Sequence, residues 1–452
     1  MTETILPAAM FLALVLGLFS SLPVGIVLMG VTLAFGALAL LLGEMRFVQF
    51  TLMPNRIFGG IIENPVLVAA PMFIFMGLVM EKTRIAEDLL LALQKVLRVV
   101  PGGLALAVTL MGTILAAATG IIGASVVMLT VLAIPTMLER GYSPALAAGT
   151  VASAGTLGIL IPPSVMLVFM GDLLTLNLAR LFVAAFAPGM VLAACYVLYI
   201  VVRSALDPAS APRGPRPAPG ETEGLWIELL VALALPFLII VAVLGSILGG
   251  IATPTEASGV GAAAALLLGL LRGRLDGPTL HAALDGSVRT IAMLFFIFVG
   301  ATAFAYVFRH VGGEAFIVNT ARGLEFGDWG LLAMMMLMVF VMGFFFDWIE
   351  ITLIVLPIFA PIVQIMDLGD HIARADLIYW FAVLVAVNLQ TSFLTPPFGF
   401  ALFYLKGAAG GSLAMGEVYR GIVPFVALQL AVLALLIWQP WIVTALPDYL
   451  LR

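Results

Sequence analysis

The chain has 452 residues, of which 63% are hydrophobic and 10% are charged, and its mean hydropathy is +1.21. Soluble globular domains average about 45–50% apolar and about 25% charged residues, so a soluble fold could not bury this much hydrocarbon. The net charge of −5, from 20 bases and 25 acids, offers no basic surface for nucleic acid.

Long apolar runs recur from one end of the chain to the other. Residues 229–247 and 262–271 are apolar on every face, whereas the strands of a transmembrane barrel alternate apolar and polar residues. The sequence therefore predicts an all-α polytopic membrane protein. The apolar stretch that starts at Ile5 has no basic n-region before it and extends beyond any signal-peptide cleavage site, so we expect it to be retained as a span.

The first charged stretch of the chain lies at residues 81–99. Ile85, Leu89, Leu93 and Leu97 recur every four residues, with charged side chains between them. This spacing predicts an amphipathic arm helix in the membrane interface.

A polar linker is predicted at residues 203–224, where five prolines and three arginines occur. Such a composition cannot form a packed core, so the linker separates a first half, residues 1–202, from a second half, residues 225–452. The linker arginines and Arg272 flank two apolar runs, and the positive-inside rule places both in the cytoplasm.

The two halves match in the same order at three places. The run 73–77 resembles 296–300, Pro135 corresponds to Pro357, and the pair Pro162-Pro163 corresponds to Pro396-Pro397. This order predicts an internal repeat, a frequent construction in secondary transporters. If the repeats are inverted, the N-terminus lies on the external side.

The two proline pairs must interrupt their helices, because proline lacks the backbone donor and clashes with the preceding turn. Interrupted segments in corresponding halves indicate a transporter binding site, so we predict re-entrant hairpins near 145–171 and 381–407. The alternative is a plain proline kink in a spanning helix. Backbone oxygens freed at such breaks suit a small cation; the residues concerned are Gly155, Gly158, Pro162, Thr395 and Pro396.

Asp347 and Glu350 share one helix face between two apolar runs. Ionisable groups inside a span are costly and usually functional, so Asp347 is predicted to hold a cation or a proton; the alternative places both acids at the membrane surface, beside Trp348. The repeat aligns Ser125 with Asp347 and Thr130 with Thr352. Further uncharged oxygens lie near the breaks: Thr156, Ser164, Asn388, Thr391 and Ser392.

Enzyme and cofactor motifs are missing from the sequence. Cys195 is the one cysteine, the three histidines lie far apart, and there is no Walker Gly-Lys-Ser/Thr motif. We therefore expect neither an ATP-driven pump nor an intramembrane enzyme, and no cofactor.

Several of these segments are specific to one family. The run 141–149 leading into 155–164, then 253–259 and 388–399, resembles the DctM-type large permease of tripartite ATP-independent periplasmic (TRAP) transporters over nearly the whole chain. The resemblance implies an inverted-repeat elevator transporter with interfacial arm helices and two re-entrant hairpins. It also implies uptake of an organic acid anion coupled to sodium, in the bacterial inner membrane.

By position, the resemblance assigns sodium to Ser125, Gly155, Gly158, Pro162, Asp347, Thr352, Thr395 and Pro396, and substrate contacts to Thr156, Ser164, Asn388, Thr391 and Ser392. Relatives often have more hydroxyl groups around the first break than residues 123–128 have here. The implied partners are a small DctQ-type membrane subunit on a separate chain and a periplasmic DctP-type binding protein. The alternative function is a stand-alone ion-coupled elevator carrier of the arsenite, citrate or sodium–proton type. The sequence does not name the substrate.

Overall fold

The structure of the chain is a computed structural model that describes residues 2–20, 22–119, 122–215, 224–323, 325–396 and 399–451. The described residues are almost entirely helical, and ten of their helical segments are long and apolar enough to cross a bilayer. The all-α polytopic fold expected from the composition is thus confirmed. Residues 216–223 of the predicted linker and residues 397–398, which include Pro397 of the second proline pair, lie outside the described residues.

Each half of the chain begins with helices that we call the outer group. Their bounds are α1 (Thr2–Leu18), α2 (Val24–Leu41), α3 (Phe47–Thr51), α4 (Met53–Ile57), α5 (Ala69–Lys82), α6 (Ile85–Leu97), α12 (Leu225–Leu248), α13 (Pro254–Leu271), α14 (Gly277–His310) and α15 (Gly313–Gly323). The helix α6 forms within the predicted arm segment and packs against α7 and α12. Small residues bring the outer helices together: a Cβ atom added to Gly261 of α13 would lie 2.7 Å from Met76 of α5.

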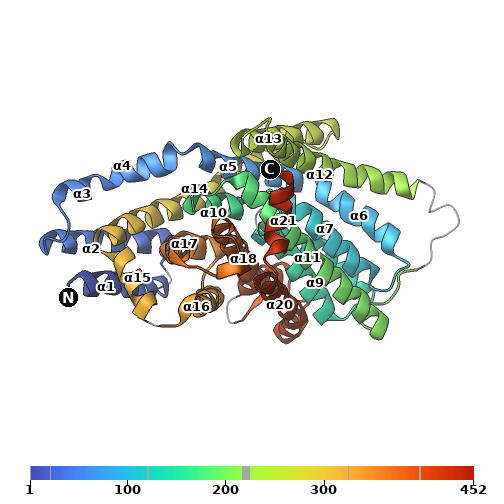
Figure 1. The fold of residues 1–452 in the computed structure, drawn as a ribbon. Helices are drawn as coiled ribbons and strands as arrows, with labels where there is room; N and C mark the ends of the chain where they lie inside the picture. The colour runs from blue at the N-terminus through green and yellow to red at the C-terminus, as the bar shows by residue number, and fades with distance from the viewer. Residues whose placement is uncertain are drawn as a thin grey trace.

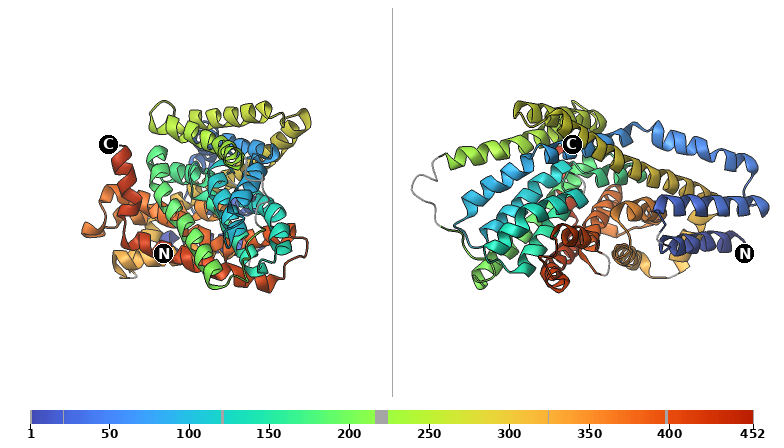
Figure 2. Two further views of the ribbon diagram at one scale, coloured as in Figure 1. Left: turned by 90° about the vertical axis from the view of Figure 1, so that its right-hand side faces the viewer. Right: turned by 180° about the vertical axis from the view of Figure 1, so that it is seen from behind.

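The second part of each half supplies what we call the hairpin group. Its helices are α7 (Gly103–Thr119), α8 (Ile122–Glu139), α9 (Pro144–Thr156), α10 (Val165–Leu173), α11 (Leu178–Leu206), α16 (Gly327–Met342), α17 (Trp348–Ile365), α18 (Arg374–Leu394), α19 (Phe400–Ala408), α20 (Met415–Trp438) and α21 (Trp441–Leu450). In Figure 1, α7, α9 and α11 lie beside α6 at one extremity, and α1 and α2 lie at the other. Figure 2 shows the same separation from behind.

The long helix α11 defines the two ends of the bundle in the first half. Its 29 residues extend about 43 Å at 1.5 Å per residue, and it ends where residues 207–215 begin, which we call the linker end of the bundle. Both outer ends of the α7–α8 pair lie there, because Gly102 N donates to Ala211 O (3.2 Å) and Ser143 N donates to Ser210 O (2.9 Å). The pair α7–α8 is therefore a re-entrant hairpin; residues 120–121, between the two helices in sequence, lie outside the described residues.

The segment around Pro162 is a broken crossing helix. The helix α9 starts beside Ser143 at the linker end, whereas α10 leads into α11 at the opposite end. The two arms have different neighbours: α9 packs against α7, α8 and α20, and α10 packs against α5, α11 and α17. The prediction of a hairpin near 145–171 is therefore corrected. The prolines open the backbone, but tertiary packing carries the chain across instead of back.

The second half has the same parts in the opposite sense. Asp367 N donates to Asp328 Oδ2 (2.9 Å), so the outer ends of α16 and α17 meet, and these two helices form a hairpin whose tip is residues 343–347. The helix α18 starts beside α11, where Arg180 Nη2 donates to Asp376 Oδ1 (2.6 Å). The helix α19 leads to α20, whose Gly421 contacts Ala145 at the linker end. The α18–α19 segment therefore also crosses, and the hairpin predicted near 381–407 is corrected in the same way.

The described part of the linker packs onto the hairpin group. Ala211 is fully buried and Ser210 is 6% exposed, and Gly214 N donates to Arg98 O (2.8 Å). Residues 207–215 thus fasten the end of α11 to the start of the first hairpin, although their composition alone indicates an exposed coil.

Candidate functional site

A cavity of 80 Å³ lies where the two hairpins and the two broken helices meet. We call it the Asp347 cavity. Residues from the start of α8, the first turn of α17, both breaks, α5 and α14 line it: Ile74, Ile122, Gly123, Val165, Thr290, Met293, Leu294, Asp347, Trp348, Ile349, Phe393, Phe400 and Tyr404. Among these residues, Asp347 contributes the carboxylate.

Local sequence explains why Asp347 stands at the hairpin tip. It caps the N-terminus of α17: its Oδ1 accepts a hydrogen bond from Trp348 N (2.7 Å), and its own N donates to Glu350 Oε2 (3.1 Å). Such a capping box satisfies amide donors that a helix start leaves unpaired. The positive end of the helix dipole also favours a negative charge at this position.

The depth of Asp347 bears on the alternative that it lies at the membrane surface. The 18 residues of α17 extend about 27 Å from Asp347 to the opposite end of the bundle. Trp348 is 5% exposed and lies near the ring of Phe169 at 6.2 Å between centroids. Trp348 therefore marks the interior of the hairpin group, and the surface alternative does not describe this structure.

The first half of the chain contributes small and hydroxyl residues near the Asp347 cavity. Gly123 lies under the Tyr404 ring, because a Cβ atom added to it would lie 3.1 Å from Tyr404 Cζ. Ser125, two residues further along the first turn of α8, is 6% exposed. Gly155 lets the first break approach α8, since a Cβ atom there would lie 3.1 Å from Val126 Cα. The residues that the repeat aligns, Ser125 and Asp347, thus lie at the starts of α8 and α17, and both helix starts line the Asp347 cavity.

The predicted substrate-contacting residues are buried and bonded to nearby carbonyls. Thr156 Oγ1 donates to Ser153 O (2.9 Å), and Ser164 Oγ donates to Ile159 O (2.5 Å). Asn388 Nδ2 donates to Met336 O (2.6 Å), and Thr391 Oγ1 and Ser392 Oγ donate to Asn388 O (2.6 and 3.5 Å). All five are at most 1% exposed, and none of them lines the Asp347 cavity.

The other predicted ion-binding residues fall into three positions. Gly155, Gly158 and Pro162 are buried in the first break, while Thr395 is partly buried and Pro396 exposed in the second. Thr395 Oγ1 donates to Thr391 O (2.6 Å). Thr352, two residues after Glu350, is fully buried, and its Oγ1 has no hydrogen-bond partner among the described residues. Thr130, its counterpart, donates to Val126 O (2.7 Å).

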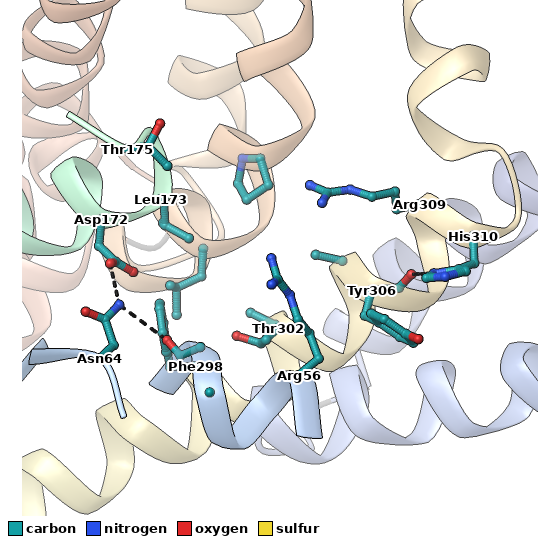
Figure 3. A pocket seen from close by; sticks show the side chains of 16 residues that line it. Arg56, Asn64, Asp172, Leu173, Thr175, Phe298, Thr302, Tyr306, Arg309 and His310 are labelled. Carbon is teal, nitrogen blue, oxygen red and sulfur yellow. Dashed lines mark hydrogen bonds between the residues drawn. The ribbon is translucent and has the colours of Figure 1, made fainter. Parts of the chain in front are cut away.

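A second and larger cavity, of 690 Å³, lies between the outer group and the hairpin group (Figure 3). We call it the arginine cavity. Its lining comes from the segment 56–64, the end of α10, α14 and α17: Arg56, Gly59, Gly60, Asn64, Asp172, Leu173, Thr175, Phe298, Ala301, Thr302, Ala305, Tyr306, Arg309, His310, Leu353 and Pro357. The sequence analysis missed this site; its available signal was Arg56 and Arg309 bordering apolar segments.

Three aromatic rings separate the two cavities. The centroid of the Phe169 ring lies 5.4 Å from that of Phe298 and 6.2 Å from that of Trp348. Phe298 lines the arginine cavity and Trp348 lines the Asp347 cavity. These rings, from α10, α14 and α17, form an aromatic wall between the two spaces.

Comparison with known proteins places this architecture in a family. Residues 11–442 match the family model described as the DctM component of the tripartite ATP-independent periplasmic transporter. The chain is 31% identical to the C4-dicarboxylate TRAP transporter large permease protein DctM of Pseudomonas aeruginosa, over 86% of this chain and 87% of that protein. It is 28% identical to the ectoine/5-hydroxyectoine large permease protein UehC of Ruegeria pomeroyi, over 98% of each.

Two further comparisons concern chain organisation and fold. The isethionate TRAP transporter permease protein DctMQ of Oleidesulfovibrio alaskensis is 30% identical over 84% of this chain, and the match covers 58% of that protein. The fold is similar to that of the YdaH transporter of Alcanivorax borkumensis, with a TM-score of 0.58 and 16% identity over 87% of this chain and 88% of that one. The chain therefore belongs to the DctM family, the large permease component of tripartite ATP-independent periplasmic transporters.

Proposed function

We propose that this chain is the membrane permease of a sodium-coupled TRAP transporter that takes up an organic acid anion across the bacterial inner membrane. The observation that carries the proposal is the Asp347 carboxylate at a hairpin tip, facing a cavity where both hairpins and both broken helices meet. A carboxylate with backbone and hydroxyl oxygens suits a hard monovalent cation. The bound cation would offset the negative charge of the substrate.

The proposed sodium ligands are the predicted ones, of which Asp347 lines the cavity. Asp347 supplies the charge, Ser125 the hydroxyl from the first half, and Thr352 a buried hydroxyl that has no hydrogen-bond partner among the described residues. Backbone oxygens of Gly155, Gly158, Pro162, Thr395 and Pro396 remain predicted ligands at the breaks. The predicted substrate contacts at Thr156, Ser164, Asn388, Thr391 and Ser392 would require these side chains to exchange their present carbonyl partners for substrate.

An inverted repeat and an elevator motion are the proposed mechanics. Their support is that the first half places its hairpin at the linker end and the second half places its hairpin at the opposite end. The outer group packs largely on itself, through α5, α13, α14 and α2, and so would serve as the scaffold past which the hairpin group slides. In this arrangement the linker end faces the cytoplasm.

The proposed partners are a small membrane subunit and a periplasmic substrate-binding protein. Family membership supports both, because the family is named for a tripartite, periplasmic system. The small subunit is proposed to be a separate chain. Related proteins are named for C4-dicarboxylates, isethionate and ectoine; the first two are net anions and ectoine is a zwitterion with a carboxylate, which favours a substrate with an anionic group.

The test is uptake into proteoliposomes that contain this chain and its small partner. Uptake is measured with and without an inward sodium gradient, and with and without the binding protein. We expect transport to need both, and Asp347→Asn to abolish the response to sodium. Asp370→Asn, which neutralises an exposed acid of the same half, is the matched control. Sodium-driven uptake without the binding protein would instead establish a stand-alone carrier.

A further inference from the structure

The lining of the arginine cavity holds two guanidinium groups and one carboxylate. Figure 3 shows the guanidinium groups of Arg56 and Arg309 pointing toward the same space, Arg56 from below and Arg309 from the right of the view. Asp172 is the one carboxylate of the lining. Its Oδ1 accepts a hydrogen bond from Asn64 Nδ2 (2.5 Å), which holds the carboxylate against the segment 56–64 but does not cancel its charge.

The two arginines differ in what they contact. Arg309 Nε lies 2.7 Å from Glu314 Oε1 at the start of α15. Arg56, in α4, has an exposed side chain, and no described residue forms a salt bridge with it. A cation among membrane helices is costly unless an anion or water compensates it. Arg56 is therefore the group in this cavity that gains most from a bound anion.

The position of the cavity connects it to the Asp347 cavity. Thr290 and Leu294 line the Asp347 cavity, and Phe298, Thr302 and Arg309 line the arginine cavity. These residues follow one another at helical spacing along a single face of α14. The rings of the aromatic wall connect the two linings, since Phe169 lies 5.4 Å from Phe298 of one and 6.2 Å from Trp348 of the other.

The size of the cavity fits a small organic ion. Its 690 Å³ is within the roughly 300–1,000 Å³ typical of ligand pockets. Guanidinium groups bind carboxylate and sulfonate oxygens through paired N–H donors. The space lies between the outer group and the hairpin group, which would move past each other in the proposed mechanism.

We propose that the arginine cavity is an anion-binding station in which Arg56, assisted by Arg309, holds the carboxylate or sulfonate of the substrate next to the Asp347 cavity. The inference rests on the proposed transport function, and it restricts the substrate class to organic anions. Arg56 selects for charge in this station, and Asp347 holds the coupling cation beyond the aromatic wall.

The test uses a cysteine reporter in the cavity. Because Cys195 is the one cysteine of the chain, Cys195→Ala provides a thiol-free background, to which Thr302→Cys is added. The full chain in phosphatidylcholine proteoliposomes is labelled with an anionic sulfonatoethyl or a cationic trimethylammonioethyl methanethiosulfonate. We expect Arg56→Gln to lower the anionic-to-cationic rate ratio about fivefold, as one unit charge at roughly 8 Å in a wet cavity would. Arg289→Gln changes an arginine of α14, the helix that carries the Thr302→Cys reporter, but lies outside the cavity, so it should leave the ratio unchanged.

Protection of the thiol identifies the occupant. Succinate or isethionate should slow anionic labelling in the Arg56 background and not in Arg56→Gln, whereas neutral succinamide should have no effect. An unchanged rate ratio in Arg56→Gln, or no protection by either acid, overturns the proposal. Protection by added phosphatidylglycerol alone overturns it too, because a lipid phosphate would then occupy the cavity. Failure of sodium-dependent uptake would refute the transport function and leave these rates unaffected, so the two failures are distinguishable.

Discussion

The contact between the second hairpin tip and the second broken helix gives a sharp prediction at Gly343. This residue ends α16, and a Cβ atom added to it would lie 1.8 Å from Ser392 Oγ and 2.0 Å from Ser392 Cβ. Rotating the serine side chain moves Oγ but not Cβ, so it cannot relieve the overlap, and Ser392 Cα itself lies at 3.1 Å. Gly343→Ala must therefore displace the tip that presents Asp347.

The size of the displacement follows from the overlap. The Cβ–Cβ separation of 2.0 Å is about 1.4 Å below the shortest ordinary contact of 3.4 Å. Overpacking of this kind typically costs about 1–3 kcal/mol, and misplacing a functional group by about 1 Å can lower a rate about 100-fold. We expect Gly343→Ala to reduce sodium-driven uptake at least tenfold while the protein remains folded.

Sodium-driven uptake and the thermal unfolding midpoint are measured on four proteins: the wild type, Gly343→Ala, and Gly343→Ala combined with Ser392→Gly or with Ser392→Ala. Because Ser392 is itself a predicted substrate contact, rescue is judged by the unfolding midpoint: Ser392→Gly removes the clashing Cβ and should restore the midpoint, whereas Ser392→Ala retains that Cβ and should not. Wild-type uptake in Gly343→Ala, or equal rescue by both partners, would refute the steric argument.

Three further outcomes follow from other contacts. Tyr196→Phe removes the hydroxyl that accepts a hydrogen bond from Gln429 Nε2 (2.7 Å) and should lower the free energy of unfolding by about 1–3 kcal/mol. Adding Gln429→Leu should recover most of this loss in thermal unfolding, and no recovery would contradict a hydrogen-bond origin. Gly421→Ala places a Cβ 1.9 Å from the backbone oxygen of Ala145 in α9 and should lower the unfolding midpoint. The control Gly416→Ala, where nothing lies within 4 Å of the added Cβ, should lower it less, and equal midpoints would contradict the close helix contact. Asn64→Ala removes the hydrogen-bond donor to Asp172 and should change the uptake rate without changing the affinity for sodium. A changed sodium affinity would show that the effect of this contact is not restricted to the arginine cavity.

Much of the fold class could be read from the sequence. Apolar runs, the amphipathic segment that forms α6, and the capping pair Asp347 and Glu350 are local patterns, and local patterns determine helices and their ends. The proline pair at Pro162 also determines that the backbone must open. These features depend on residues that are close together in the chain.

The direction of the chain beyond each break was not a local property. Gly155 and Pro162 are compatible with either a hairpin or a broken crossing helix, because both need the same open backbone. The choice is made by long-range contacts: Ser143 with Ser210 at the linker end, and the packing of α10 on α11 and α17. The predicted interruptions of the helices near the proline pairs were therefore correct, but the prediction that the chain returns there as a hairpin was wrong.

The candidate site divides in the same manner. The sequence by itself determined that Asp347 is a charged group between apolar runs, and it predicted that Ser125 corresponds to Asp347. Only the tertiary structure decided that Arg56 and Arg309, which are far apart in the chain, share one cavity, and that Phe169, Phe298 and Trp348 close it off from Asp347. A helix pattern specifies which face of a helix is apolar, but which other helix covers that face is settled by the packing of the whole chain.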